Sequence, residues 1–501
     1  MKVVVGYPPI ESDKGVALLS QNRQFQYFNA PTYIYPMVPA YAATYLQSRD
    51  HEVVWMDGIA EGWGYEEFMS RLEREAPELI LMETKTPVVK RSWEAVTDLK
   101  GRFPDMKVVL CGDHVTWNPE ETFAACPVDY ILKGGDYDFL IVNLVEHLTR
   151  GTDLEGGIVW RDGDSIADSG PMNLKSHRID DLPMIDRELT KWRLYAYHNG
   201  NYKYLPGTYT YTGRDCWWGK CTFCVWDHVL YPPGNFRMHS PERMLDEVGH
   251  LIDLGVKEIF DDCGTLPIGA WLDKFCKGMI ERGYNKQVVF GCNMKPGHLK
   301  QSQYDLMGEA GFRFILYGIE SGNQKTLDRL DKGGTVHEIE DSLRMAKQAG
   351  LEPHITVMIG YPWEDEADSR QTVEFAKRVF RKGYVDTLQG TIVVPYPGTP
   401  LFYECKNNGW LLTEDWDRYD MRESVMRCGV SNEQALAYVR DLYKAFMSPQ
   451  YIARKVMSVR SVDDVKFLAS AGKKLVGHLV DFKKDQPAQT ADDADRGKVA
   501  V

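Results

Sequence analysis

Apolar strands alternate with amphipathic helices along the first 150 residues. We expect strands at 2–7, 52–57, 79–83, 107–111 and 128–132, and helices at 35–48, 66–75, 92–103, 119–125 and 139–148. This alternation predicts an α/β domain with a doubly wound parallel sheet and helices on both of its faces. In such sheets, ligands bind at the carboxyl ends of the strands.

The loops at those carboxyl ends are the first candidate sites. They cover residues 7–9, 84–86, 112–114 and 134–136. No GxGxxG sequence follows the first expected strand, so the pattern does not support an ordinary nicotinamide site.

A change in pattern marks the end of this domain. Residues 157–166 resemble a hairpin with Asp162 and Gly163 at the turn. Residues 173–187 then contain Pro183 and few apolar positions. We therefore predict a Rossmann-like domain over 1–172 and a linker over 173–200.

A second alternation fills residues 201–400. Ser240 is a suitable N-cap and Pro241 a suitable first residue for a helix that ends at Gly255. Strands are expected at 204–211, 258–260, 288–291, 314–318, 354–359 and 388–394, with helices between them. Six such units fit a partial (β/α)6 barrel, whose active site would lie at the carboxyl ends of the strands.

The end of the chain has a different pattern. Residues 401–482 are predicted to form a helical C-terminal region, with apolar periodicity in 433–446 and 464–480. Residues 483–501 are polar and suit a disordered tail.

Composition narrows the class of protein. The 501 residues are 44% hydrophobic and 26% charged, as in ordinary globular proteins. We find no run of about 18 apolar residues and no signal peptide, so we expect a cytoplasmic protein without a membrane span. The net charge of −13 argues against general affinity for nucleic acid.

Three of the ten cysteines stand apart from the rest. Cys216, Cys221 and Cys224 fall within nine residues, on a loop after the expected strand 204–211. The other seven are scattered and are expected to be reduced, mostly buried thiols: Cys111, Cys126, Cys263, Cys276, Cys292, Cys405 and Cys428.

Two kinds of metal site fit the three clustered thiols. With His228, they are a candidate Cys3His zinc site. Alternatively, three thiolates hold an iron–sulfur cluster and leave one iron open to a ligand. The loop follows a barrel strand, so the open iron would face the barrel mouth, and this placement favours the cluster.

The loop resembles that of radical S-adenosylmethionine (SAM) enzymes, whose pattern is CxxxCxxC with an aromatic residue before the last cysteine. Phe223 matches that aromatic residue. The first gap departs from the pattern, because four residues rather than three separate Cys216 from Cys221. The resemblance implies a [4Fe-4S] cluster held by Cys216, Cys221 and Cys224.

Later segments continue the resemblance in the family's order. They are 260–264, 317–322, 357–362 and 395–400. The resemblance implies SAM contacts from Asp262, Asn293, Glu320, Ser321 and Gly360. Asp262 would bind the amino group of SAM, although an N-cap role suits it equally well. Tryptophans beside the cysteines are candidates for the wall of the site or for packing.

The N-terminal half resembles the cobalamin-binding branch of the same superfamily. The similar segments are 36–39, 112–120 and 128–136. The implied cobalamin contacts are Tyr7, Pro9, Thr84, Thr86, Gly112, Asp113, His114, Gly134, Gly135 and Asp136. The DxHxxG motif is missing, so we expect no protein histidine to coordinate cobalt, and His114 to structure a loop. A flavodoxin-like domain without cobalamin is the alternative.

The resemblance also implies the chemistry. The reduced cluster would cleave SAM to a 5′-deoxyadenosyl radical, and cobalamin would deliver a methyl group to an unactivated carbon, remethylated by a second SAM. A non-methylating rearrangement or cyclisation is the alternative within this class, and a zinc-stabilised binding module is the alternative outside it. We expect a small-molecule or peptide substrate and an external flavodoxin- or ferredoxin-like electron donor. No catalytic side chain is assigned.

Overall fold

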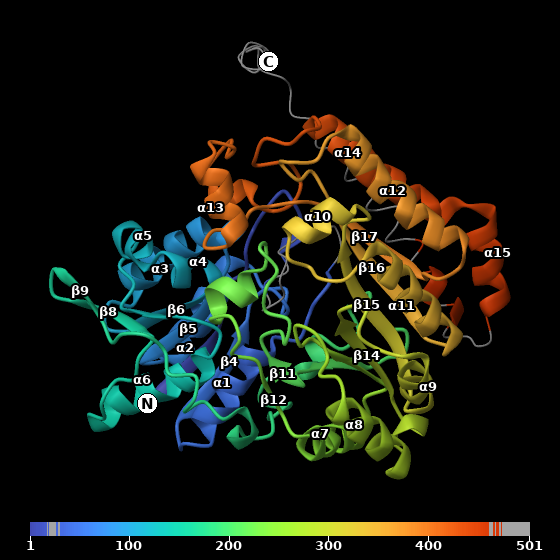
Figure 1. Cartoon of the computed structure of the whole chain (residues 1–501). Helices are drawn as coiled ribbons and strands as arrows, with labels where there is room; N and C mark the ends of the chain where they lie inside the picture. The colour runs from blue at the N-terminus through green and yellow to red at the C-terminus, as the bar shows by residue number, and fades with distance from the viewer. Residues whose placement is uncertain are drawn as a thin grey trace.

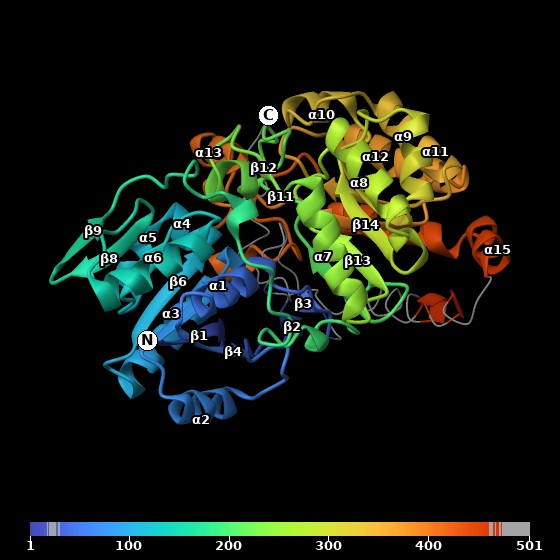
Figure 2. The ribbon, with the colours of Figure 1, turned by 90° about the horizontal axis from the view of Figure 1, so that it is seen from below.

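A computed structural model describes most of the chain. It covers residues 1–17, 19, 27–28, 31–459, 464–465, 467–469 and 472. The predicted helix over 464–480 therefore lies largely, and the predicted tail over 483–501 entirely, outside the described residues. Figures 1 and 2 show two α/β bodies side by side, an N-terminal domain in blue and teal and a barrel in green to orange.

The N-terminal sheet has seven strands in the order β4-β1-β5-β6-β7-β8-β9. The first five are parallel, and β8 and β9 add an antiparallel hairpin at one edge. Their bounds are β1 Lys2–Tyr7, β4 Glu52–Asp57, β5 Leu79–Thr84, β6 Lys107–Gly112, β7 Tyr130–Leu132, β8 Ile158–Asp162 and β9 Ser165–Asp168. The chain direction across the sheet reverses between β1 and β5, and ligands bind at such a switch point in open α/β sheets.

Helices cover both faces of this sheet, as the alternating pattern predicts. With this strand order, the right-handed rule for parallel crossovers puts α1 on one face and α2 and α3 on the other. Helix α6 packs beside α1. The helices are α1 Met37–Gln47, α2 Tyr65–Glu75, α3 Val89–Arg102, α4 Asp113–Trp117, α5 Pro119–Ala125 and α6 Tyr137–Arg150. The doubly wound sheet is thus confirmed. A small hairpin, β2 Val16–Ala17 with β3 Tyr27–Phe28, was not predicted.

The second body is the predicted partial barrel. Six parallel strands pair in chain order, with β10 and β17 at the two edges. They are β10 Gly207–Thr210, β13 Glu258–Asp261, β14 Val289–Met294, β15 Phe312–Glu320, β16 Glu352–Ile359 and β17 Thr387–Ile392. The intervening helices are α7 Pro241–Asp253, α8 Ala270–Glu281, α9 Gln301–Glu309, α10 Gln324–Arg329, α11 Val336–Gln348 and α12 Glu366–Arg381. Ser240 caps α7 by accepting a hydrogen bond from the backbone N–H of Arg243 at 3.3 Å.

The segment between the two bodies is packed rather than solvated. Ile179, Leu182, Trp192 and Tyr195 are all buried. The Tyr195 hydroxyl donates to Asp57 at 2.7 Å in the N-terminal domain. The predicted linker over 173–200 is therefore a connector held against the N-terminal domain. Its apolar residues have no helical or strand spacing, so periodicity did not reveal their burial.

The C-terminal region is only partly helical, unlike the prediction. It contains α13 Pro400–Asn407, α14 Asn432–Tyr443 and α15 Pro449–Ser458. Between α13 and α14, residues 408–431 return to the N-terminal domain, where Trp416 Nε1 donates to Glu121 at 2.9 Å and Lys90 pairs with Asp415 at 2.5 Å. This segment is held by contacts with a distant part of the chain, which local patterns do not encode.

Among the helices that the structure describes, none has the length and apolar character needed to cross a lipid bilayer.

Replacing Gly112 with alanine is expected to destabilise the N-terminal sheet. Gly112 ends β6 at φ +123°, and an added Cβ would lie 1.9 Å from the carbonyl oxygen of Thr84 on the neighbouring strand. We expect a loss of about 2 kcal/mol or more, measured by chemical denaturation. Gly101→Ala in α3 is the control, because its Cβ would meet no atom within 4 Å. That variant should be neutral or stabilised by up to about 1 kcal/mol.

Candidate functional site

The cysteines lie on a long loop closed by a two-residue ladder. β11 (Gly213–Arg214) pairs antiparallel with β12 (Arg237–Met238). β11 follows barrel strand β10 closely, so the loop leaves the barrel at the carboxyl edge of its first strand. This is where the sequence placed it.

A left-handed glycine lies within the enlarged first gap. Gly219, between Cys216 and Cys221, has φ +60°, and an added Cβ would lie 3.3 Å from the Cys216 carbonyl oxygen. The backbone therefore turns tightly there, and this turn accommodates the extra residue. A second tight turn follows, in which the Cys224 N–H donates to the Cys221 carbonyl at 3.0 Å.

The three thiols differ in exposure. Cys221 is buried, whereas Cys216 and Cys224 are half-buried. Burial raises the pKa of Cys221 to about 12, and the nearby Lys332 ammonium acts against this rise. Without a metal, this thiol is therefore protonated at neutral pH, and a metal would replace its proton.

A buried lysine, Lys295, and a half-buried one, Lys332, accompany the thiols at the barrel mouth. Thiolates at Cys216 and Cys221 would raise the pKa of both Lys295 and Lys332. Burial, with the charge of Lys332, lowers the pKa of Lys295 to about 8. Its Nζ is 2.8 Å from His298 Nε2 and 4.1 Å from the ring centre of Trp218. Cations in this position suit the negative charge of a thiolate-bound cluster. The sequence analysis did not identify Lys295, because no sequence pattern indicates that this lysine is buried.

The tryptophans of the loop anchor it to the barrel. Trp217 Nε1 donates to the Leu266 carbonyl at 3.0 Å, and Trp218 Nε1 donates to the Asp331 carbonyl at 2.7 Å. Packing is therefore a role of both side chains.

The geometry does not support the zinc alternative. His228 Nε2 lies 3.1 Å from the backbone carbonyl of Cys221, so its ring contacts the loop backbone. Within the described part of the chain, no three His, Cys, Asp or Glu side chains are arranged to hold one metal ion. Ligands of a four-iron cluster bind separate irons and are spaced more widely. The described residues therefore give no support to the Cys3His zinc site, and the cluster assignment stays a prediction from the sequence.

Asp262 and Asn293 are neighbours beside the loop. Asn293 Nδ2 donates to Asp262 Oδ1 at 3.3 Å, across the carboxyl ends of β13 and β14. Gly264 lies close beneath the loop, because an added Cβ would be 2.9 Å from the Cβ of Cys216. The 260–264 segment and the first cysteine are therefore in direct contact.

Glu320 ends β15 in an unusual backbone conformation. Its φ is +61°, and the pairing register shifts between Gly318 and Glu320. The carboxylate accepts a hydrogen bond from Lys332 Nζ at 3.0 Å. Strained non-glycine residues of this kind are concentrated at functional sites.

Ser321 and Gly360 have different surroundings. The Ser321 hydroxyl is fully buried, 2.9 Å from Thr372 Oγ1 of α12, so it has a packing partner. Gly360 has φ +99° and accepts a hydrogen bond from the Cys428 thiol at 2.9 Å. Glu364, beyond it, is buried, and burial raises its pKa to about 7.

The predicted cobalamin residues Thr86, Asp113 and His114 form one cluster at the N-terminal sheet. Asp113 Oδ1 accepts from the Thr86 N–H at 3.0 Å. His114 is fully buried, and its ring nitrogens lie 3.3 Å from Thr86 Oγ1 and 3.3 Å from Glu121 Oε2. Both ring nitrogens thus have protein partners, as expected of a histidine that structures a loop.

Buried polar groups lie between the strands at the switch point. Tyr7 donates to the Leu19 carbonyl at 2.8 Å and lies 3.2 Å from Asp57. With Glu83 they line a small enclosed cavity between β1, β4 and β5. Burial raises the pKa of Glu83 to about 7. Of the neighbouring predicted residues, Thr84 hydrogen-bonds Ser92 at 2.6 Å and Pro9 packs against Gly58.

Three predicted cobalamin residues instead contact the cysteine loop. The Gly135 N–H donates to the Leu230 carbonyl at 3.0 Å, and an added Cβ there would be 2.2 Å from the Tyr231 ring. Gly134 approaches the same carbonyl. Asp136 is fully buried and pairs with Arg214, Arg237 and His177. The family resemblance assigned these three residues to cobalamin binding. In this structure they contact other residues of the protein.

The two carboxyl edges face each other. Lys85, just after β5, is buried, and burial lowers its pKa while the charges of Glu83, Asp113 and Asp262 act in the opposite direction. Asp262 belongs to the barrel, and the other two carboxylates belong to the N-terminal domain. Residues of the two predicted cofactor sites are therefore close enough to interact.

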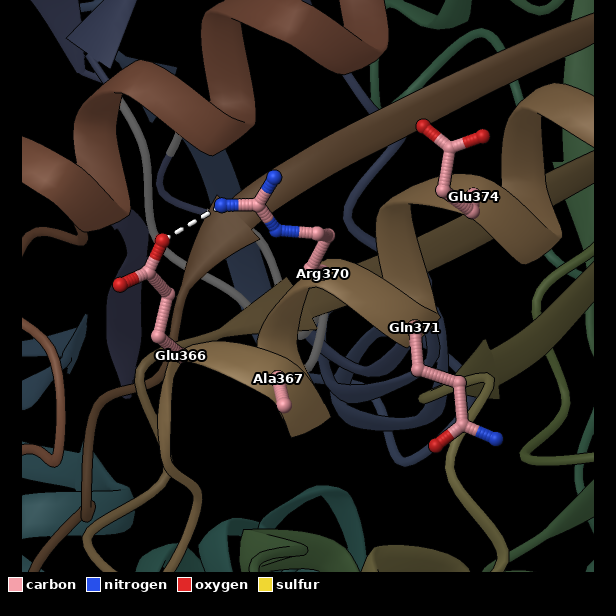
Figure 3. A pocket seen from close by; sticks show the side chains of 5 residues that line it. All are labelled: Glu366, Ala367, Arg370, Gln371 and Glu374. Atoms are coloured by element: carbon pink, nitrogen blue, oxygen red, sulfur yellow. Dashed lines mark hydrogen bonds and ion pairs between the residues drawn. The ribbon is translucent and has the colours of Figure 1, made fainter.

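A surface depression on α12 is not a comparable site. It is lined by Glu366, Ala367, Arg370, Gln371 and Glu374, all exposed, and Figure 3 shows the Glu366–Arg370 ion pair of 2.5 Å. Exposed pairs of this type contribute little.

His177 is expected to make stability depend on pH. Burial lowers its pKa, but the carboxylates of Asp136 and Glu155, at 2.9 and 3.1 Å, outweigh burial and raise the pKa to about 9. Because the folded pKa exceeds the unfolded value of 6.5, this stabilisation is complete below pH 6.5 and is lost as the pH rises through about 9. Melting temperatures should fall over this range, and His177→Gln should reduce the fall. His337→Gln, on an 84% exposed side chain, should leave it unchanged.

Comparisons with known proteins agree with this geometry. Residues 210–376 match the radical SAM superfamily model. An uncharacterized methyltransferase of Pyrococcus horikoshii, PH0819, is 27% identical over 84% of this chain and 89% of its own. An anaerobic magnesium-protoporphyrin IX monomethyl ester cyclase of Cereibacter sphaeroides is 23% identical over 74% of this chain, which spans 60% of that protein.

The fold also has a solved counterpart. The radical SAM methyltransferase TsrM of Kitasatospora setae, whose structure contains cobalamin and a [4Fe-4S] cluster, matches with a TM-score of 0.68 at 14% identity. The match covers 89% of each chain. The arrangement of the N-terminal domain and the barrel therefore has a known counterpart in the fold of this enzyme.

Proposed function

Residues 210–376 form a radical SAM domain, and on that basis we propose that the chain is a cobalamin-dependent radical SAM methyltransferase acting on an unactivated carbon. One observation carries the proposal. The cysteine loop lies against the loops at the carboxyl ends of the N-terminal strands, because the Gly135 N–H donates to the Leu230 carbonyl at 3.0 Å and Asp136 pairs with Arg214 and Arg237. A methyl donor on one edge and a SAM-binding cluster on the other would share one substrate space.

Each set of residues has a task in this proposal. Cys216, Cys221 and Cys224 hold the cluster, and the unliganded iron is left for SAM. The Asp262 carboxylate, oriented by Asn293, binds the ammonium group of SAM, and Glu320 binds its ribose or amino group. Gly360 and its strand pack against adenine. Lys295 and Lys332 offset the negative charge of the cluster.

The N-terminal domain supplies the second cofactor site. Thr84, Thr86, Asp113 and the loop from Tyr7 to Pro9 offer hydroxyl, carboxylate and backbone groups at the switch-point edge. His114 stays within its own hydrogen bonds, so cobalt has no ligand from it. When bound, the cluster supplies the electron that cleaves SAM, and cobalamin supplies the methyl transfer. The barrel mouth, with its buried Lys295 and Glu320, limits access of water to the reacting centre.

Two partners complete the proposal. The substrate is a small molecule or a peptide, and a flavodoxin- or ferredoxin-like protein supplies the electron. The cyclase relative favours one alternative, in which the same radical carries out a rearrangement or cyclisation without methyl transfer.

Product analysis separates these functions. The anaerobically reconstituted full chain should hold about four irons, four sulfides and one cobalamin. With SAM and a reductant, methyl transfer predicts both S-adenosylhomocysteine and 5′-deoxyadenosine. The cyclisation alternative predicts 5′-deoxyadenosine without S-adenosylhomocysteine. Zinc without iron–thiolate absorption would contradict both.

A further inference from the structure

Two arginines face each other at the base of the cysteine loop. Arg214 of β11 and Arg237 of β12 are directly paired across the ladder that closes the loop. Like charges in such a pair repel each other. Arg214 is also buried, with 2% of its surface exposed. The ladder therefore needs negative charge from another part of the chain.

That charge comes from the N-terminal domain. Asp136 Oδ1 accepts from Arg214 Nη1 at 2.9 Å and from Arg237 Nη2 at 2.9 Å. Asp138 accepts from Arg214 Nη1 at 2.7 Å and also pairs with its Nη2. Both aspartates are fully buried, at the start of α6. Two carboxylates thus neutralise two guanidinium groups, and one of them binds both ends of the loop.

The network is rigid because its geometry is bidentate. Arg214 contacts both oxygens of Asp138, and Arg237 contacts both oxygens of Asp136. Arginine–carboxylate pairs of this kind fix orientation as well as distance. His177 of the connector completes the shell around Asp136 at 2.9 Å. The carboxylates have no room to move without leaving a buried charge unpaired, which is costly.

We infer that Asp136 and Asp138 are positioning residues for the iron–sulfur cluster. Arg214 is two residues before Cys216, so fixing its guanidinium fixes the start of the ligand loop. Gly135 adds a third anchor, through its hydrogen bond to Leu230 later in the same loop. The inference rests on the proposed function, because it assumes that Cys216, Cys221 and Cys224 bind a cluster.

The inference gives the N-terminal domain a second task, beyond carrying its own cofactor. It holds the ligand loop of the neighbouring domain in shape. Outer partners of metal ligands commonly change metal affinity 10- to 100-fold. The cluster should therefore depend on Asp138 even when cobalamin is omitted.

Asp138→Asn tests this directly. Asparagine keeps the shape but removes the charge and turns an amide donor toward Arg214. In the reconstituted full chain, we expect iron release to a chelator to be about 10- to 100-fold faster, with altered electron paramagnetic resonance g values of the reduced cluster. Circular dichroism and elution volume should match the wild type. The control is Asp168→Asn. This substitution removes an ion pair with Lys133 in which the Asp168 side chain is 48% exposed, and the variant should release iron at the wild-type rate.

A second variant distinguishes a weakened cluster site from a folding defect. Arg214→Lys keeps the buried charge but loses the fork that contacts both oxygens, and it should release iron faster in a normally folded chain. If both variants keep the wild-type release rate and g values, the inference is wrong. It is equally wrong if neither variant folds, because the network would then serve the fold rather than the cluster. If the wild type itself binds no iron, the proposed function fails first.

Discussion

Replacing Cys221 with alanine is expected to abolish SAM cleavage. Cys221 is the buried member of the three thiols, and its loss leaves only two ligands for the proposed cluster. We expect 5′-deoxyadenosine formation to fall by more than about 1,000-fold, because the electron source is removed. Chromatography of the products after anaerobic incubation with SAM and reductant measures this.

Cobalamin binding should survive in the same variant. The proposed cobalamin residues belong to the N-terminal sheet, so binding measured from the absorbance of the purified complex should stay close to wild type. Cys126→Ala, a buried cysteine outside the loop, is the matched control and should keep SAM cleavage. Continued cleavage by Cys221→Ala would show that the cluster has been assigned to the wrong residues.

Arg313→Ala is expected to destabilise the barrel strongly. Arg313 joins the amino ends of three strands: Nε donates to Glu258 at 2.9 Å, and Nη1 donates to Glu352 at 2.6 Å. Glu258 is 2% exposed, and burial already raises its pKa while Arg313 lowers it. Removing the arginine leaves a buried carboxylate without its counter-charge, which costs about 3–5 kcal/mol. Chemical denaturation measures the change in the free energy of unfolding.

Two further variants test whether burial of the charge causes this loss of unfolding free energy. Arg282→Ala removes a surface pair with Asp246, whose side chain is 61% exposed, and should cost less than about 1 kcal/mol. Adding Glu258→Gln to Arg313→Ala should recover part of the loss, because the unpaired charge is then gone. If the two arginine variants lose equal stability, burial is not the cause.

Local sequence predicted the elements of both bodies well. The β-branched run at residues 2–7 and the capped helix beginning at Pro241 formed as expected, because each depends on residues close in the chain. The six barrel strands also appeared in the predicted order. Errors arose where no period exists, as in the connector with Trp192 and the segment with Trp416, which distant parts of the chain hold in place.

The candidate site was predicted less evenly. The three cysteines were evident from spacing alone, and Asp262 with Asn293 came from the resemblance to radical SAM enzymes, which assigns such contacts to the ends of barrel strands. Asp136 illustrates the opposite case. Its position after a strand suggested a cofactor contact, whereas the structure pairs it with two arginines 78 and 101 residues away. No sequence pattern marks such partners.

The cysteine loop shows the division between the two sources of information. By itself, the sequence determined that soft ligands lie within nine residues after a barrel strand, because ligand type and strand order are local properties. Only the tertiary structure decided that Lys295 lies beside these thiols and that Asp136 and Asp138 hold the ends of their loop. Buried charges must find opposite charges in space, and folding brings those together without regard to their separation along the chain.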